Sequence, residues 1–297
     1  MLNYLPYNQR TPDTQYSDLL RFILNHGTRS KSQTGTDTIS FMAPNPMHFD
    51  LQNGFPIITE RSIKRFWKAP IGELLAFING AHTQESLSEF GCTWWEPWVS
   101  EKKCAKRGLP TGDLGPGSYG AAFHDFPTKD GGSFNQFDFL VRQIKEKPHL
   151  KTHIVTPFIP QYLYRVEGHQ QKVVVVPCHG LIHVRVIDGK LSLIMWQRSG
   201  DVPVGVPANM VQYAALTLLL AHVTGNQPHM YIHMLSDAHI YVDQVDKVQG
   251  IIERDPRPFP TVTFDTTKTD LFSFRKDDFE LTDYDPHPGM KDIPVAV

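Results

Sequence analysis

Cysteine and arginine side chains lie in two polar clusters in the second half of the chain, and together they could supply a nucleophile. Cys178 stands between Pro177 and His179, and four valines precede Pro177, so we expect a buried strand to end here. Arg198 lies in the polar run 197–201, at the end of a strand that we expect to reach Cys178. A guanidinium beside a thiol favours the thiolate, which is the nucleophilic form of cysteine. The pair predicts nucleophilic catalysis; the structural alternatives are an inert core cysteine and a strand-end salt bridge.

Two further polar clusters lie on either side of an apolar stretch. Asn209 stands at the expected entry to a helix, where it could be an N-cap. Its amide also offers a donor and an acceptor, which suits the edge of a nucleobase. Asp237, His239 and Tyr241 follow a strand-like run, at an expected strand-to-helix turn. A hydrogen-bonded core histidine is the alternative for His239.

Composition limits the classes of partner. The 297 residues include 29 Lys and Arg against 31 Asp and Glu, and the net charge of −2 argues against a partner bound through many phosphates, such as duplex DNA. Three cysteines without a CxxC spacing do not form a disulfide framework. No stretch approaches the roughly 20 apolar residues of a membrane span, and the N-terminus lacks a signal-peptide pattern. We therefore expect a cytoplasmic enzyme or binding domain without a membrane partner.

The hydrophobic pattern predicts one domain over residues 1–297, of class α+β, with a mixed sheet, packed helices and a long buried central helix. Helical spacing of apolar residues predicts helices at 13–25, 71–79, 136–145, 209–223 and 241–252. Extended patterns predict strands within 38–51, at 173–176, 181–187, 191–196 and 230–234, and short strands within 261–279. The dipeptide Asp188-Gly189 predicts a tight hairpin between the third and fourth of these.

The polar clusters, taken in order, resemble the signature of thymidylate synthase. The matching motifs are Pro177-Cys178-His179, Gln197-Arg198-Ser199-Gly200-Asp201, Gly205-Val206-Pro207-Ala208-Asn209, Asp237-Ala238-His239-Ile240-Tyr241 and the tail Tyr284-Asp285-Pro286-His287-Pro288-Gly289 with Pro294-Val295-Ala296-Val297. Earlier matches are Thr34-Gly35-Thr36, Gly54-Phe55-Pro56, Glu73-Leu74-Leu75 and Gly112-Asp113-Leu114-Gly115-Pro116. Several independent motifs in one order, from about residue 15 to the end, make the similarity specific.

The resemblance implies carbon transfer from 5,10-methylenetetrahydrofolate to C5 of a pyrimidine nucleoside monophosphate. Cys178 would be the nucleophile that adds to C6, and Arg198 would lower the pKa of its thiol. Glu73 would be the general acid and base, Tyr119 would lie near C5, and His179 would complete the catalytic group. Thiolates add reversibly to conjugated carbons, which suits this chemistry.

The resemblance also assigns binding residues. Those for the nucleotide are Gln197, Arg198, Ser199, Asn209, His239, Tyr241 and Lys151. Those for the folate are Asp201, Trp95, Trp98, Gly205 and Val297. The family pattern further implies a homodimer in which phosphate ligands, here Lys151, cross between subunits, and it implies no metal.

Several positions depart from the family's pattern. Three of its phosphate-binding arginines are replaced by Gln33, Lys151 and Thr152. Such replacements are not conservative, because only a guanidinium binds phosphate with two parallel hydrogen bonds. The other departures are Ala208 in place of an aromatic residue, Asp243 in place of an asparagine, an added residue at Gly117-Ser118 and a longer segment 156–172. Most of these changes surround the nucleotide, whereas the folate side is kept.

We therefore favour hydroxymethylation of a uracil nucleotide such as dUMP, in which water adds to the transferred carbon. Asn209 favours uracil, and Ala208 leaves room beside the sugar or base. The alternative is a classical thymidylate synthase that makes dTMP and dihydrofolate. A CMP or dCMP hydroxymethylase and a non-catalytic nucleotide- or nucleic-acid-binding homologue also remain open. The retained Cys178 and Glu73 count against the last of these.

Overall fold

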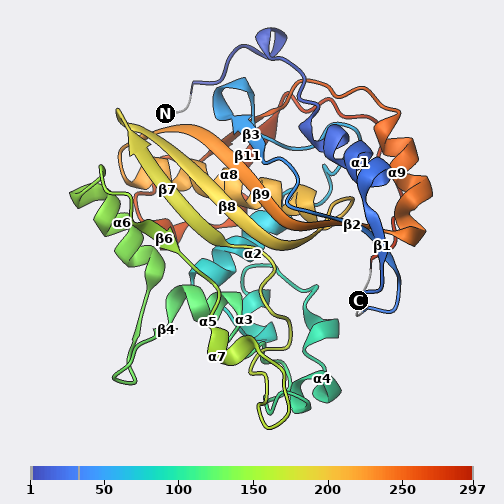
Figure 1. Ribbon diagram of the computed structural model, residues 1–297. Coiled ribbons are helices and arrows are strands. Elements are labelled where there is room, and N and C mark those ends of the chain that lie inside the picture. The colour runs from blue at the N-terminus through green and yellow to red at the C-terminus, as the bar shows by residue number, and fades with distance from the viewer. Residues whose placement is uncertain (1–2, 33, 296–297) are drawn as a thin grey trace.

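A twisted seven-stranded sheet forms the centre of the computed structural model, which describes residues 3–32 and 34–295 (Figure 1). Its strand order is β1-β2-β9-β8-β7-β6, and β3 also pairs with β9. The strands are β1 (Thr28–Ser30), β2 (Thr38–Met42), β3 (Met47–Asp50), β6 (His153–Val155), β7 (Leu181–Ile187), β8 (Lys190–Asp201) and β9 (Gln227–Tyr241). Only β8 and β9 pair in parallel, so the sheet is mixed and the predicted α+β class is confirmed.

The predicted hairpin joins β7 to β8. Asp188 and Gly189 have φ angles of 49° and 72°, as the tight turn between twisted antiparallel strands requires. The register places Leu181 opposite Trp196. The start of β7 therefore lies beside the last residues of β8, at one edge of the sheet.

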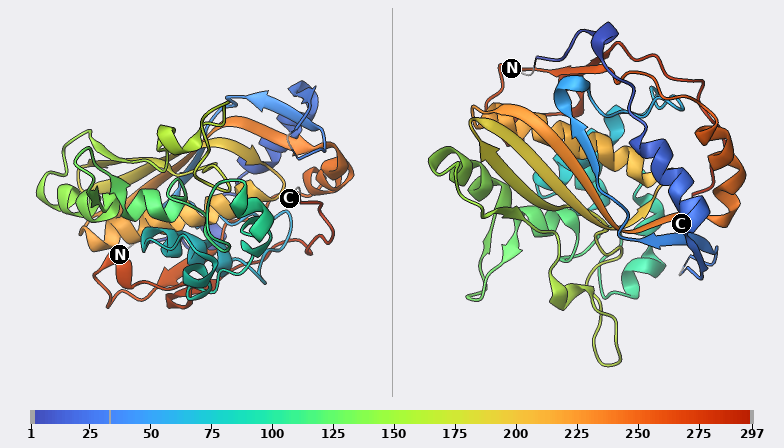
Figure 2. Two further views of the ribbon diagram at one scale, coloured as in Figure 1. Left: turned by 90° about the horizontal axis from the view of Figure 1, so that it is seen from below. Right: turned by 45° about the horizontal axis from the view of Figure 1, so that its top comes forward.

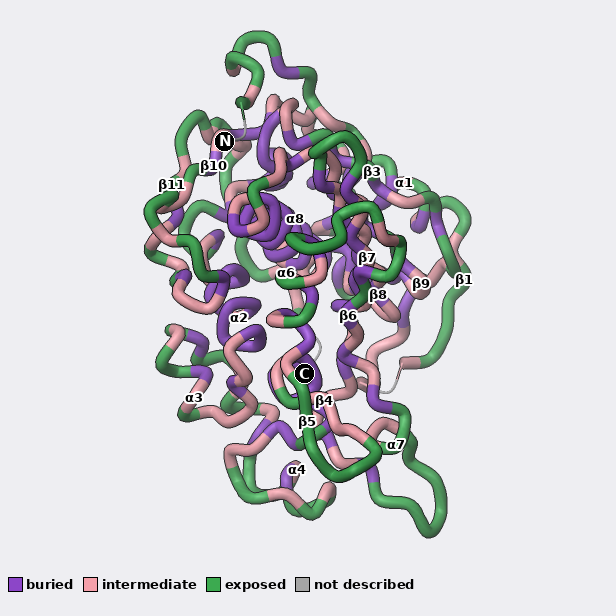
Figure 3. The backbone as a smooth tube through the Cα atoms, turned by 90° about the vertical axis from the view of Figure 1, so that its left-hand side faces the viewer, coloured by how far each residue is buried: buried purple, intermediate pink, exposed green. Residues whose placement is uncertain are grey.

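Helix α8 (Gly205–Val223) connects β8 to β9 and is apolar on nearly all sides. Its residues are buried almost throughout (Figure 3), because it lies between the sheet and helix α2 (Lys68–Ile78) (Figure 2). Contrary to the prediction from the sequence, this helix is long and apolar enough to cross a membrane, and it is the one such helix among the described residues; 89% of its most apolar stretch is buried inside the structure. It is the predicted central helix.

The other elements surround this core. The remaining helices are α1 (Gln15–His26), α3 (Gln84–Ser88), α4 (Glu101–Ala105), α5 (Tyr119–His124), α6 (Gln136–Glu146), α7 (Pro160–Leu163) and α9 (Val245–Ile252). Short 3₁₀ turns are η1 (Tyr7–Gln9), η2 (Leu51–Asn53), η3 (Glu96–Trp98), η4 (Val242–Gln244), η5 (Leu271–Ser273) and η6 (Lys276–Asp278). Two small ribbons pair β4 (Phe126–Pro127) with β5 (Ser133–Phe134) and β10 (Thr261–Phe264) with β11 (Phe279–Thr282).

The valine run 173–176 is not a strand, contrary to the prediction. Val173 is fully buried, and the amide of Val174 donates to the carbonyl of Leu114 in a loop. Only Val173 of the four is buried in the core, and Pro177 has no N–H to continue a ladder. Cys178 therefore lies in a loop before β7, and not at the end of a strand.

Two predicted boundaries near the polar clusters are also wrong. Asp237, His239 and Tyr241 do not form a turn, because β9 continues through them and pairs with β2. Helix α8 begins at Gly205, so Asn209 is not an N-cap. Its side chain is consequently free to face the site from within the helix.

The fit of α8 in the core gives a stability prediction. Leu219 is 1% exposed, and Leu219→Ala is expected to lower the free energy of unfolding by about 2–5 kcal/mol, since a cavity replaces buried methyl groups. Chemical denaturation measures the difference. Lys190→Ala, at an exposed position, is the control and should change it by less than about 0.5 kcal/mol. A loss below about 1 kcal/mol for Leu219→Ala would contradict the packing described.

Candidate active site

The polar clusters meet at the edge where β8 and β9 end. These strands run in parallel, and their register places Ser199 beside Asp237 and Asp201 beside His239. Cys178 reaches the same edge because the antiparallel strand β7 begins there. In parallel sheets ligands commonly bind at the carboxyl ends of adjacent strands, and β8 and β9 form a parallel pair here.

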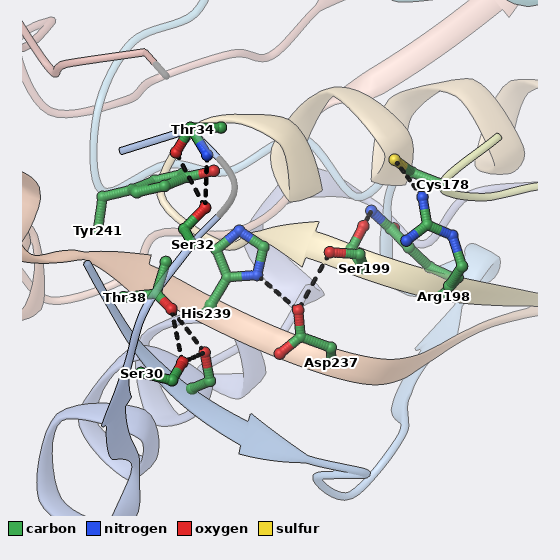
Figure 4. A network of polar contacts seen from close by, with 12 residues as sticks. Ser30, Ser32, Thr34, Thr38, Cys178, Arg198, Ser199, Asp237, His239 and Tyr241 are labelled. Carbon is green, nitrogen blue, oxygen red and sulfur yellow. Dashed lines mark hydrogen bonds and ion pairs between the residues drawn. The ribbon is translucent and has the colours of Figure 1, made fainter. Parts of the chain in front are cut away.

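Cys178 and Arg198 are in contact, as the sequence predicts (Figure 4). Nη2 of Arg198 lies 3.3 Å from Sγ of Cys178. The guanidinium also donates to the carbonyls of Pro177 and Val176, at 3.1 and 3.2 Å. These carbonyls orient the guanidinium, and the strand backbone adds a bond from the Arg198 amide to the Cys178 carbonyl.

Arg198 lowers the pKa of the Cys178 thiol, as expected, but a larger effect opposes it. Burial raises the pKa of Cys178 above its ordinary value of 9.0, and this effect exceeds the lowering by Arg198. Removal from water disfavours the charged thiolate unless a neighbouring cation stabilises it. The site thus holds Cys178 mainly as the thiol at neutral pH, with Arg198 opposing the effect of burial.

Thiol alkylation tests this balance. Modification of Cys178 by iodoacetamide should rise with pH without reaching a plateau below pH 9, because only the thiolate reacts. Arg198→Gln should slow the reaction at pH 8 by about tenfold, since an adjacent cation lowers a thiol pKa by about one unit or more. Peptide mapping separates Cys178 from the buried Cys92 and Cys104. A rate unaffected by the substitution would show that Arg198 does not act on the thiol.

Tyr119 and His179 pack beside the cysteine. The Tyr119 hydroxyl accepts from the Cys178 amide at 2.6 Å, and its ring stacks on His179 with centroids 4.6 Å apart. Nδ1 of His179 lies 2.6 Å from the Tyr213 hydroxyl. Burial lowers the pKa of His179 to about 3, so this imidazole is neutral and can orient Tyr119 without carrying charge.

Glu73, on α2, receives N–H donors from three side chains. The indoles of Trp94 and Trp95 donate to Oε1 at 2.8 and 2.7 Å, and Nε2 of Gln212 donates to Oε2 at 2.8 Å. Burial raises the pKa of Glu73, while the three donors lower it. A raised pKa suits a carboxylate that must take up and release protons.

Asn209 lies between two glutamines. Gln197 donates to its Oδ1 at 3.0 Å, and its Nδ2 donates to Oε1 of Gln212 at 2.8 Å. Gln197 in turn contacts His233 and the Ser199 carbonyl, at 2.8 and 3.0 Å. The amide of Asn209 keeps one acceptor and one donor position for a ligand.

His239 and Tyr241 line a cleft of about 660 Å³ between β1, β2 and β9. Asp237 accepts from Ser199 Oγ at 3.1 Å and bonds Nδ1 of His239 at 3.0 Å (Figure 4). Six hydroxyl side chains line much of the remaining wall, beside His26, Lys31, Phe41 and Met42; the six are Thr28, Ser30, Ser32, Thr34, Thr38 and Ser40. Such a wall suits a ligand rich in oxygen atoms, such as a sugar phosphate.

Asp201 lies beside the C-terminal tail. Nε2 of Gln244 donates to both Asp201 oxygens at 3.2 Å and to the Pro294 carbonyl at 2.9 Å. Burial raises the pKa of Asp201 to about 6. Gly205 begins α8 nearby, whereas Val297 lies outside the described residues. Gln244 therefore holds the tail against Asp201.

The family model described as thymidylate synthase matches residues 14–297. The chain belongs to the thymidylate synthase family. It is therefore a one-carbon transferase that acts at C5 of a pyrimidine nucleotide, with 5,10-methylenetetrahydrofolate as co-substrate. The predicted family membership is confirmed over nearly the whole chain.

Lys151 and Trp98, which the thymidylate synthase pattern assigns to ligands, form no side-chain hydrogen bond to the residues around Cys178 in the described part of the chain. Lys151 is exposed before β6, and the β6–β7 register places it toward the far end of β7 from Cys178. Trp98 lies under the ammonium of Lys103, 4.4 Å from the ring centroid. Gln33, where the family pattern has an arginine, lies outside the described residues.

Gln212, Trp94 and the hydroxyl wall are parts of the site that the motifs did not reveal. Gln212 follows Asn209 by three positions, so both face the same side of α8. A polar residue inside an otherwise apolar helix was the available signal. Within residues 3–32 and 34–295, no three His, Cys, Asp or Glu side chains converge as a metal site would require.

Proposed function

We propose that this member of the thymidylate synthase family is a hydroxymethylase of a uracil nucleotide such as dUMP. The one-carbon unit of 5,10-methylenetetrahydrofolate would be joined to C5, and water would supply the hydroxyl oxygen. Tetrahydrofolate would leave without donating a hydride. The products would be a 5-hydroxymethyl nucleotide and tetrahydrofolate.

Cys178 would act first, by adding its sulfur to C6 of the base. This addition makes C5 a nucleophile toward the transferred carbon. Loss of the proton from C5 would then expel tetrahydrofolate and leave a methylene group on C5, water would add to that methylene, and expulsion of the sulfur from C6 would restore the ring. The proposal is supported by the contact between Arg198 and Sγ at 3.3 Å. Since burial raises the pKa of the free thiol, deprotonation would accompany nucleotide binding. Tyr119, bonded to the Cys178 amide, would lie near C5.

The hydrogen bonds around Glu73 are the observation that supports water, rather than a hydride, as the group that adds to the transferred carbon. Three of the roughly four acceptor positions of a carboxylate are occupied by Trp94, Trp95 and Gln212. The remaining position can accept one water, and a carboxylate with a raised pKa is a stronger base toward it. Glu73 would therefore deliver hydroxide to the transferred carbon.

The nucleotide would extend from Asn209 toward the hydroxyl-lined cleft. His239 and Tyr241 would hold the sugar, while Arg198 and Ser199 would contact the phosphate. Ala208 would leave room beside the sugar or base. The many hydroxyl donors of the cleft would partly replace the missing arginines, at the cost of weaker, neutral hydrogen bonds.

The folate would lie between Asp201, Gly205, Trp95 and Trp98, with the C-terminal tail closing over it. Support comes from Gln244, which joins Asp201 to the tail at Pro294. The Trp95 indole donates to Glu73, so Glu73 and the folate site would be adjacent.

A cytoplasmic location for this reaction is part of the proposal.

A homodimer is part of the proposal. One face of β7, β8 and β9 is turned to the viewer in Figure 1 without a helix before it. Apolar side chains that are partly or fully exposed on the sheet include Ile154, Ile194, Trp196, Ile232 and Met234. A second copy would cover them, and its Lys151 would reach the phosphate. Light scattering at micromolar concentration tests this, and a monomer would contradict it.

The reaction is tested by product analysis. The protein is incubated with labelled 5,10-methylenetetrahydrofolate and, separately, with dUMP, dCMP, UMP and CMP. We expect a labelled product from dUMP that is heavier than dTMP by one oxygen, together with tetrahydrofolate. Formation of dTMP and dihydrofolate would show a classical thymidylate synthase. Absence of product with every nucleotide, together with nucleotide or nucleic-acid binding, would show a non-catalytic homologue.

A further inference from the structure

Six side chains form a continuous series of hydrogen bonds that begins at Tyr231 and ends at Glu73. The Tyr231 hydroxyl lies 3.0 Å from Nδ1 of His233, and Nε2 of His233 lies 2.8 Å from Oε1 of Gln197. Gln197 contacts Asn209, which contacts Gln212, which contacts Glu73, at 3.0, 2.8 and 2.8 Å. The first five side chains are buried, so water does not compete for these bonds.

We propose that Gln212 is a positioning residue that fixes the amide of Asn209 in the orientation that accepts uracil and rejects cytosine. The inference rests on the proposed function, in which Asn209 contacts the base. Gln212 itself would touch neither nucleotide nor folate. It would act through Asn209 on one side and through Glu73 on the other.

The direction of the segment from Gln197 to Glu73 is set on both sides by groups that can only accept. The Ser199 carbonyl accepts from Nε2 of Gln197 at 3.0 Å, so this nitrogen, and not Oε1, faces Asn209. At the other end the Glu73 carboxylate accepts from Nε2 of Gln212, which leaves Oε1 of Gln212 facing Asn209. Asn209 must therefore direct Oδ1 to Gln197 and Nδ2 to Gln212.

This orientation determines which base can pair with Asn209. The free lone pair of Oδ1 accepts an N–H, and the free hydrogen on Nδ2 donates to a carbonyl, which matches N3–H and O4 of uracil. Cytosine presents an acceptor at N3 and a donor at N4, so it needs the amide reversed. A reversed Asn209 would set Nδ2 against the nitrogen of Gln197 and Oδ1 against the oxygen of Gln212. Both buried pairs would then be unmatched, which is costly.

The test compares two substitutions of Gln212 with a control on the same helix. Gln212→Leu removes both of its bonds, so one of the two mismatches that oppose a reversed Asn209 disappears and only the mismatch with Gln197 remains. We expect the ratio of dCMP to dUMP dissociation constants, measured by titration calorimetry without folate, to fall by about tenfold or more. Thr217→Val, a buried polar-to-apolar change whose hydroxyl bonds only within α8 to the Tyr213 carbonyl, should leave the ratio unchanged.

Gln212→Glu separates the two contacts. A glutamate still accepts from Asn209, so base discrimination should remain within about threefold of the unsubstituted chain. A second carboxylate beside Glu73 should move the acidic limb of the kcat profile to higher pH, because like charges raise each other's pKa. Cys92 and Tyr213 also feel the charge of Glu73, but burial raises the pKa of each, so neither creates that limb.

The outcomes distinguish the inference from the function on which it rests. A lower ratio in Gln212→Leu with an unchanged ratio in Gln212→Glu supports the role of Gln212. If the chain binds dUMP and all three variants keep its discrimination, the inference is overturned while the proposed function stands. A chain that binds dCMP as well as dUMP before any substitution overturns the inference directly. If the unsubstituted chain binds neither nucleotide, the proposed function itself fails, and the inference fails with it.

Discussion

Replacing Cys178 with serine is expected to lower kcat by at least about 10³-fold while leaving the fold and nucleotide binding intact. A serine hydroxyl is almost wholly protonated near neutral pH and does not add readily to C6 of a pyrimidine. Removal of a nucleophile typically costs several orders of magnitude in rate. The side chain shrinks only slightly, and Arg198 keeps its bonds to the carbonyls of Pro177 and Val176. Steady-state product formation measures the loss, and calorimetry measures nucleotide binding.

Cys104→Ser is the matched control for this substitution. Its thiol is buried 3.2 Å from the Val99 carbonyl, so a hydroxyl can keep the bond, and activity should stay within about twofold. Unchanged turnover in Cys178→Ser would refute the nucleophile assignment. Loss of nucleotide binding together with turnover would indicate a structural role for the thiol.

Replacing Glu73 with glutamine is expected to lower kcat by about 10²–10⁴-fold, the usual contribution of general acid–base catalysis. The substitution preserves shape but removes the group that takes the proton from water. It also sets an amide nitrogen against Nε2 of Gln212 unless one of the two amides turns. Dissociation constants for dUMP should change far less than kcat, because Glu73 contacts the base only through Gln212 and Asn209 in the proposal.

The pH profile identifies the group. Burial raises the pKa of Glu73, so the active carboxylate should be lost as pH falls through a value above that of an ordinary glutamate, and kcat should fall with it. Asp201, whose pKa burial raises to about 6, titrates in a nearby range. The assignment to Glu73 therefore requires that this limb be absent from Glu73→Gln. The exposed Glu89→Gln should keep both rate and limb; a limb that persists in Glu73→Gln would belong to another group.

Local sequence patterns correctly predicted the elements whose conformation depends mainly on residues close together in the chain. The hairpin at Asp188-Gly189 was predicted because only a few residue types adopt its left-handed backbone. The central helix was predicted because an unbroken apolar helix must be buried. The valine run failed because β-branched residues suit any buried extended chain, and pairing depends on a neighbour distant in sequence. The same reason explains why β9 continues through Asp237, His239 and Tyr241: the partner strand β2 lies about 200 residues earlier in the chain.

The amino-acid sequence by itself determined the family and the α+β class and predicts which groups react, since these depend on residue type and order. Only the tertiary structure determines the protonation state of these groups. Burial raises the pKa of Cys178 although Arg198 lies beside it, and burial depends on the whole fold. The structure also brought Gln212 between Asn209 and Glu73, joining two helices separated by over a hundred residues. Such contacts arise from the packing of elements distant in sequence, so no pattern along the chain predicts them.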